Sequence, residues 1–173
     1  MKFRNLIIGL TINSLLMISC GTSPPDKGKL KVVATTTIIG DVLGAIGGEL
    51  IELNVLLPLD ADPHSFEPTP KDLAQAESAD IVFINGLGLE EALEELLQEN
   101  SGNVHAVSSG VETIAFKDGD GQEHEGSDPH VWMNPRNVIV WVDNIVSALS
   151  ELDPANAADW GSGSPFAGIV RIF

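Results

Sequence analysis

The sequence has one cysteine, no tyrosine and few basic residues. A single cysteine, Cys20, excludes an internal disulfide, a Cys-x-x-Cys redox pair and a multi-thiolate metal site. Nine Lys and Arg against 25 Asp and Glu give a net charge of −16, which excludes nucleic-acid binding because phosphate neutralisation needs basic clusters. The length of 173 residues and the 43% hydrophobic fraction predict one acidic globular domain with a core rather than a disordered chain.

The N-terminus has the pattern of a secretory signal. Lys2 and Arg4 precede an apolar run that is too short and too interrupted by polar residues to span a bilayer. Cys20 stands where the run stops, after a small serine, and this resembles a bacterial lipobox. We therefore predict a lipoprotein signal peptide over 1–19, lipid attachment at Cys20 and a tether over 20–29. The protein would then be anchored to the cell membrane on its extracytoplasmic face, in the periplasm or at the cell surface; the alternative is a plain signal peptide with an incidental cysteine.

Strand and helix patterns alternate along the rest of the chain. Short β-branched or apolar runs predict strands over 29–37, 50–57, 80–85 and 103–108. Helical spacing of apolar residues predicts helices over 38–46, 70–78, 89–98 and from 135 onwards. Thr69-Pro70 and Asn134-Pro135 are typical helix starts, and 110–127 reads as a long polar loop. This order predicts an α/β fold, a parallel four-stranded sheet with flanking helices.

One tripeptide occurs twice, as Asp62-Pro63-His64 and as Asp128-Pro129-His130. Each copy precedes a predicted capped helix. The loops that follow the carboxyl ends of parallel strands gather at one edge of a sheet, where ligands usually bind. The pattern therefore predicts that His64 and His130 face one site.

The residue types in the two tripeptides suit a cation. Neutral imidazole is the common nitrogen ligand of zinc and also binds other divalent transition metals. We therefore predict His64 and His130 as metal ligands. Three nearby carboxylates are candidates to accept the other ring N–H and fix the tautomer, namely Asp62, Glu67 and Asp128. The alternative is that each histidine only caps or fills a loop.

The other two histidines carry weaker signals. His105 lies inside an apolar strand, which favours a structural role. His124 lies in the acidic segment DGDGQEHEG and is either an auxiliary metal ligand or part of a solvated loop.

Five stretches of this sequence resemble one bacterial family. They are VVATTTIIGD, ADPHSFEPTPKDL, ADIVFINGLGLE, SDPHVWMNPRN and LDPANAADW. Together they span residues 31–160 in the order seen in the N-terminal half of cluster 9 receptors of ABC importers. These are the zinc and manganese solute-binding lipoproteins, which include zinc uptake receptors and streptococcal metal-binding adhesins. The lipobox fits the same family.

The resemblance implies two α/β lobes joined by a long helix, with one metal ion held between them. Residues 30–152 would be the N-terminal lobe and 153–160 the start of the inter-lobe helix. His64 and His130 match the family's two ligands from the first lobe, and the third and fourth ligands would come from a second lobe. The match ends at Trp160, and the tail 161–173 is off-pattern, so we expect a truncation or a frameshift with the second lobe absent.

The predicted function is metal capture for an ABC permease rather than catalysis. Imidazole preference and the order of metal affinities favour Zn²⁺ over Mn²⁺. One alternative is a surface adhesion or partner-binding module. Another is a zinc-dependent hydrolase with Glu67 as general base; it is less favoured, because metalloproteases place both histidines and the glutamate on one helix.

Overall fold

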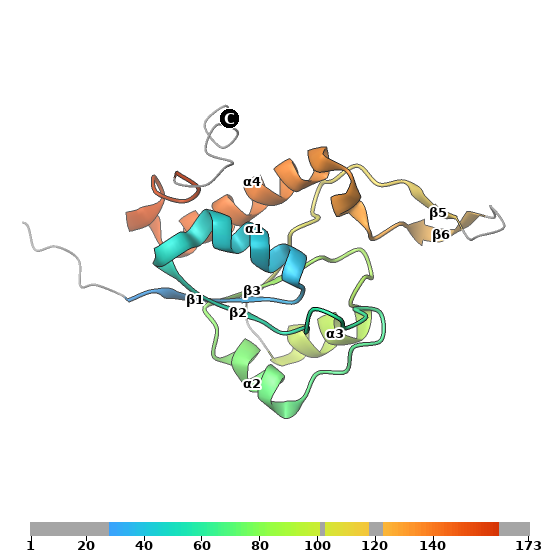
Figure 1. Cartoon of the computed structure of the whole chain (residues 1–173), viewed down its shortest axis with the longest axis horizontal. Coiled ribbons are helices and arrows are strands. Elements are labelled where there is room, and N and C mark those ends of the chain that lie inside the picture. Colours follow the sequence, from blue (N-terminus) through green and yellow to red (C-terminus); the bar gives the residue numbers. More distant parts are fainter. Residues whose placement is uncertain (1–27, 101–102, 118–122, 163–173) are drawn as a thin grey trace, which may run out of the picture.

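A computed structural model describes residues 28–100, 103–117 and 123–162 and has the predicted α/β fold. Four parallel strands form a sheet of order β2-β1-β3-β4. The strands are β1 (Leu30–Ala34), β2 (Ile51–Val55), β3 (Ile81–Ile84) and β4 (Val104–Ala106). The helices are α1 (Thr37–Gly47), α2 (Pro70–Glu77), α3 (Glu91–Asn100) and α4 (Pro135–Leu152). Figure 1 shows α1 and α4 on one face of the sheet and α2 and α3 on the other.

The central strands are buried on both faces because successive side chains point to opposite sides of a strand. Val32, Ala34, Ile81 and Phe83 pack with apolar side chains of α1 and α4. The alternate strand residues pack with Ala76 of α2 and with apolar side chains of α3. Two hydrophobic layers therefore hold the sheet, and its carboxyl edge is left to the loops.

The first strand is shorter than predicted. It ends at Ala34, and α1 begins at Thr37, whereas the sequence pattern predicted a strand over 29–37. The reason is Thr36, whose Oγ1 accepts a hydrogen bond from the backbone N–H of Ile39, 3.3 Å away, and so caps α1. The β-branched threonines that suggest a strand thus belong to a helix start.

Both predicted helix starts are confirmed. At α2, Thr69 and Asp72 form a reciprocal capping box, with Pro70 at the first helical position. At α4, the Asn134 side chain accepts a hydrogen bond from the backbone N–H of Arg136. These local signals fix where each helix leaves its preceding loop.

The long polar loop predicted over 110–127 is wrong in part. The chain there forms an antiparallel hairpin of β5 (Ala115–Lys117) and β6 (Glu123–Ser127), which extends from one end of the molecule in Figure 1. The residues of these two strands show no alternation of apolar and polar side chains. The sequence therefore does not predict their pairing.

The segment 153–160 does not begin an α-helix. After α4 it forms a one-turn 3-10 helix over Pro154–Asn156, followed by turns. Proline disfavours the helical conformation in the residue before it, and Asp153 has φ −131° and ψ 77°. Trp160 is buried in the core, and the Gly161 N–H donates to the Ile46 carbonyl, 3.1 Å away. The segment therefore packs back onto α1.

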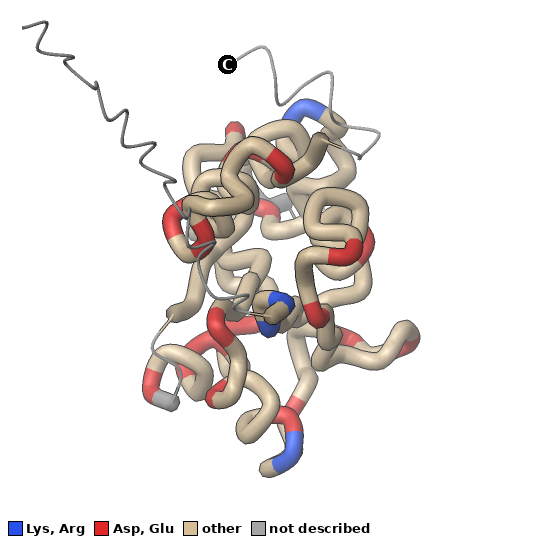
Figure 2. Tube along the Cα trace, turned by 90° about the vertical axis from the view of Figure 1, so that its left-hand side faces the viewer, with Lys and Arg blue, Asp and Glu red and all other residues tan. Residues whose placement is uncertain are grey.

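Acidic residues are spread over the whole trace, while Lys and Arg are few (Figure 2). None of the helices in the described ranges is long and apolar enough to cross a membrane. The predicted signal peptide, most of the tether, Cys20 and most of the tail lie outside the described residues.

Candidate metal centre

The two repeated tripeptides meet at the carboxyl edge of the sheet. The Nε2 atoms of His64 and His130 are 3.5 Å apart, and the ring centroids are 5.4 Å apart. Two nitrogens bound to one tetrahedral zinc at about 2.0–2.1 Å each would be about 3.4 Å apart. The predicted approach of the two rings to within reach of one ion is therefore confirmed; their role as ligands stays a prediction.

The same sequence gives the same backbone turn in both copies. Asp62 Oδ1 accepts a hydrogen bond from the His64 backbone N–H at 3.0 Å, and Asp128 Oδ1 accepts one from the His130 backbone N–H at 2.9 Å. An aspartate that bonds the backbone two residues on defines an Asx turn. Each proline thus stands inside a turn that presents the following histidine.

Only one of the three candidate carboxylates contacts an imidazole. Asp128 Oδ1 lies 2.8 Å from His130 Nδ1. The hydrogen bond from the His130 backbone, and then that from its ring, lower the pKa of Asp128. An ionised Asp128 accepts the proton on Nδ1, so the Nε2 of His130 carries the free lone pair that a metal needs.

The other two carboxylates do not reach the rings. Asp62 Oδ2 accepts from Ser65 Oγ at 3.1 Å instead. Glu67 is exposed, and among the described residues it forms no hydrogen bond or ion pair with either histidine. No contact among the described residues supports the predicted role of Asp62 or Glu67 as acceptor of an imidazole N–H.

Two further residues position His130, and the sequence analysis missed both. The Trp132 ring contacts His130 edge-on with centroids 5.3 Å apart. Asn85, buried directly after β3, donates from Nδ2 to the Pro129 carbonyl at 3.1 Å. A polar residue at the end of a fully apolar strand was the available signal for Asn85.

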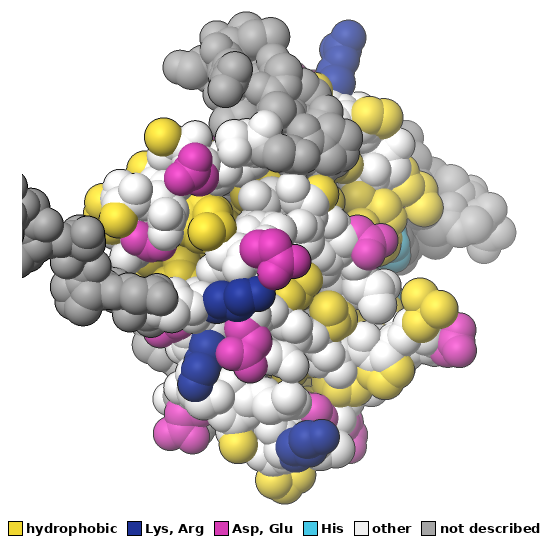
Figure 3. Space-filling model, turned by 60° about the vertical axis from the view of Figure 1, so that its left-hand side comes forward, with side chains coloured by type: hydrophobic (Ala, Val, Ile, Leu, Met, Phe, Trp, Pro, Cys, Tyr) yellow, Lys and Arg dark blue, Asp and Glu magenta, His cyan; other side chains and the backbone are white. Residues whose placement is uncertain are grey.

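Two small hollows adjoin His130, with volumes of about 130 and 220 Å³. The larger one is lined by both histidines together with Thr36, Ile38, Leu59 and Trp132. Figure 3 shows a histidine side chain reaching the surface beside hydrophobic and acidic side chains. The side chain of His64 is exposed and that of His130 is 34% exposed, so both rings are accessible to an ion from solvent.

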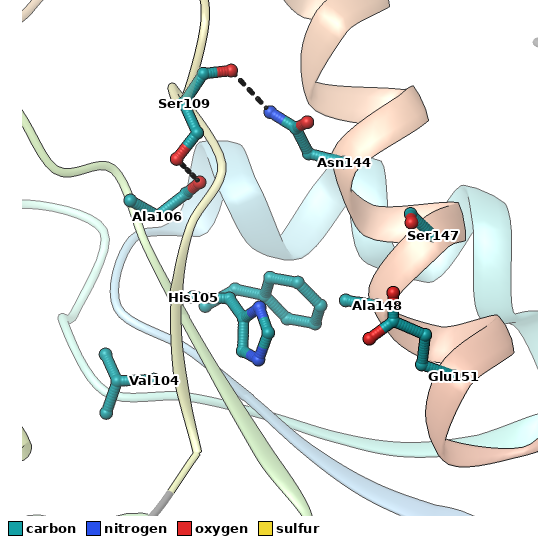
Figure 4. Close-up of a pocket in the computed structure, with 9 residues that line it drawn as sticks. Val104, His105, Ala106, Ser109, Asn144, Ser147, Ala148 and Glu151 are labelled. Carbon is teal, nitrogen blue, oxygen red and sulfur yellow. Dashed lines mark hydrogen bonds between the residues drawn. The ribbon is translucent and has the colours of Figure 1, made fainter.

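A larger cavity of 350 Å³ lies elsewhere, between β4 and α4 (Figure 4). It contains one histidine, His105, whose Nε2 is 2.7 Å from Asn103 Oδ1, and one carboxylate, Glu151. Its Asn144 is engaged with backbone carbonyls. One imidazole already bonded to an amide suits the structural role predicted for His105 better than metal binding.

The candidate centre consists of two imidazoles in the part of the chain that the structure describes. No group of three or more His, Cys, Asp or Glu that could hold a metal is found there. The backbone of His124 belongs to β6, but its side chain lies outside the described atoms, so its auxiliary role stays a prediction.

The chain is similar to a known family and to known proteins of bacteria. The family described as zinc-uptake complex component A, periplasmic, matches residues 32–162. The iron ABC transporter substrate-binding lipoprotein MtsA of Streptococcus pyogenes serotype M1 is 35% identical over 167 residues, which cover 90% of this chain and 53% of MtsA. The manganese ABC transporter substrate-binding lipoprotein PsaA of Streptococcus pneumoniae serotype 4 is 34% identical over 168 residues, with the same coverage.

The chain is also similar to solved structures of metal-binding proteins. A crystal structure of ZnuA has a TM-score of 0.71 at 26% identity and is matched over 83% of this chain and 54% of its own. The Mn-bound periplasmic metal-binding protein of Candidatus Liberibacter asiaticus has a TM-score of 0.68 at 28% identity, over 83% and 51%. The chain spans about half the length of the curated relatives it matches.

These relatives are substrate-binding components of transporters, so the hydrolase alternative is wrong. The family model covers most of the chain, including both histidine tripeptides. The chain belongs to the zinc-uptake component A family, the cluster 9 metal-binding receptors of ABC importers, and corresponds to their N-terminal lobe.

Proposed function

We propose that the chain captures a divalent transition metal as cargo through His64 and His130, for delivery to an ABC permease. The observation that carries this proposal is the 3.5 Å separation of the two Nε2 atoms. Two ring nitrogens at this distance repel each other if both lone pairs face inward, so a proton or a cation must lie between them. A metal ion accepts both lone pairs at once. The names of the relatives and of the family, which specify iron, manganese and zinc, support the same class of cargo.

Zinc is the favoured cargo of this pair. Imidazole nitrogen suits zinc, whereas carboxylate, carbonyl and water oxygens suit manganese, and divalent-metal affinity rises from manganese towards copper and zinc. Both ring nitrogens come from histidine, and the contacting carboxylate Asp128 bonds the far side of its ring. The surplus of acidic residues over the trace (Figure 2) attracts cations of either kind and does not decide between them.

The lipid anchor belongs to the same proposal. We place Cys20 at a membrane surface outside the cytoplasm, since the relatives are named as lipoproteins or periplasmic binding proteins. A diacylglycerol thioether together with an amide-linked acyl chain would give stable anchoring. None of the contacts in the described ranges favours the adhesion alternative.

An equilibrium titration with Zn²⁺ or Mn²⁺ tests the proposal. Binding is measured by competition with a chromophoric chelator. We expect one bound Zn²⁺ per chain with a Kd above about 1 μM, because two imidazoles are half of a closed tetrahedral site, and weaker binding of Mn²⁺. Absence of any zinc binding would contradict the proposed function. Tighter binding than this would show that further ligands complete the site.

Asp128 and Asp62 offer a matched pair of variants. Each forms the Asx turn of its own tripeptide, but only Asp128 also contacts an imidazole. Asp128→Ala is expected to raise the zinc Kd by about tenfold, since loss of a carboxylate behind a metal-bound histidine costs about 10–100-fold. Asp62→Ala removes a turn but no ring contact and should change the Kd by less. Equal effects of the two variants in the same titration would assign the role to the turn alone.

A further inference from the structure

A buried carboxyl group, that of Glu90, lies at the carboxyl edge of the sheet. Glu90 is 1% exposed. Its Oε1 accepts hydrogen bonds from Thr35 Oγ1 at 2.6 Å and from the Asn85 backbone N–H at 2.7 Å. Thr35 and Asn85 directly follow β1 and β3, which are neighbours in the sheet. One oxygen atom therefore joins the ends of the two central strands.

The turn between Asn85 and Glu90 brings this carboxyl back onto its own strand. Gly86, Leu87 and Gly88 all have left-handed backbones, with φ of 78°, 58° and 75°. Leu87 is the one residue other than glycine with positive φ in the described ranges, a conformation that is unfavourable for a residue with a side chain. Within this turn the Leu89 N–H donates to the Gly86 carbonyl at 3.2 Å, and Glu90 Oε1 accepts a bond from the Asn85 N–H, where the turn begins.

The same residues lead to His130. Asn85, whose N–H is held by Glu90, donates from Nδ2 to the carbonyl of Pro129. Pro129 is buried and directly precedes His130. Asn85 Oδ1 in turn lies 3.4 Å from Ser108 Oγ. The position of the Asn85 side chain thus sets the position of the loop that presents the second imidazole.

The hydrogen bonds to the Glu90 carboxyl group fall on one of its two oxygens. Oε1 accepts two bonds, whereas Oε2 is buried and has no hydrogen-bond partner among the described residues. Burial raises the pKa of Glu90 and outweighs the opposing hydrogen bonds from Thr35 and Asn85. Glu94, one turn along α3, is the charged group that acts on it in the described chain, and its like charge raises the pKa further.

We propose that Glu90 is a positioning residue of the metal centre: through Oε1 it ties the ends of β1 and β3 and, through Asn85 and Pro129, fixes the loop of His130. The metal-binding consequence rests on the proposed function. The positioning itself does not, since it concerns the metal-free protein.

Two substitutions separate geometry from charge. Glu90→Gln keeps the Oε1 acceptor without a charge, and Glu90→Leu removes the acceptor at similar volume. Glu94→Gln, in the first turn of α3, which begins directly after Glu90, is the matched control. Each protein is studied as the full chain by zinc competition titration, by ¹⁵N chemical shifts of the histidine rings without metal, and by urea unfolding across pH.

Glu90→Leu is expected to shift the ring signals of His130 but not those of His105, and to raise the zinc Kd by about tenfold. Glu90→Gln and Glu94→Gln should stay within about twofold of the wild type. A raised pKa in the folded state gives stability that is present at low pH and lost as pH rises through the folded pKa. The stability of Glu90→Gln relative to the wild type should therefore increase as pH rises above the ordinary range of a glutamate.

Unchanged His130 signals in Glu90→Leu would overturn the proposal. So would a Glu90→Gln variant that binds zinc as weakly as Glu90→Leu, because a negative charge would then be required. If Glu90→Leu does not fold, Thr35→Val removes one of the two donors at constant shape, and its His130 signals decide instead. If the wild type binds no zinc, the proposed function fails, while the metal-free spectra still decide the role of Glu90.

Discussion

His130→Ala is expected to raise the zinc Kd of this chain by about 100-fold or more. The substitution removes one of the two imidazoles whose Nε2 atoms are 3.5 Å apart. It also removes the ring that Asp128 holds in the tautomer suited to a metal. One remaining imidazole, that of His64, cannot chelate. The measurement is the same competition titration, with circular dichroism to show that the fold is kept.

His105→Ala is the matched control for this experiment. It removes the same chemical group from a strand of the same sheet, but that ring is bonded to Asn103 and lines the other cavity. Its zinc Kd should equal that of the wild type. An unchanged Kd in His130→Ala, or an equal loss in His105→Ala, would show that the histidine pair is not the metal site.

The histidine pair could be predicted from the sequence because its determinants are local. Each aspartate bonds the backbone two residues on, so a tripeptide is enough to specify the turn. The burial of β3 on both faces could also be predicted, because its residues form a continuous apolar run. The parallel sheet then brings the two loops to one edge.

The remaining features depend on contacts between distant residues. Asn85 reaches Pro129, 44 positions away, and Thr35 reaches Glu90, 55 positions away. No local pattern specifies such pairs. The β5–β6 hairpin was missed since its strands show no apolar alternation. The burial of Trp160 in the core, which draws 153–160 back onto α1, is a contact between distant residues as well. Choosing between Asp62 and Asp128 as the ring partner likewise required the side-chain geometry.

Trp141→Ala is expected to lower the free energy of unfolding by about 3–5 kcal/mol, the usual cost of a large buried aromatic. Trp141 is 1% exposed in the layer between the sheet and α4. Its Nε1 donates to Ser108 Oγ at 3.1 Å, so truncation leaves both a cavity and a buried hydroxyl without its donor. Urea unfolding, followed by circular dichroism, measures the change.

Two further variants separate these contributions. Trp141→Phe keeps most of the ring volume and loses the N–H donor, so about 1–3 kcal/mol is expected. Met133→Ala truncates a side chain that is 77% exposed and should change stability by less than about 0.5 kcal/mol. A loss in Trp141→Ala no larger than that in Met133→Ala would contradict the packing described for α4.

The core also supports the loop of His130, because Ser108 contacts both Trp141 and Asn85. Trp141→Phe should therefore weaken zinc binding even in the fully folded protein.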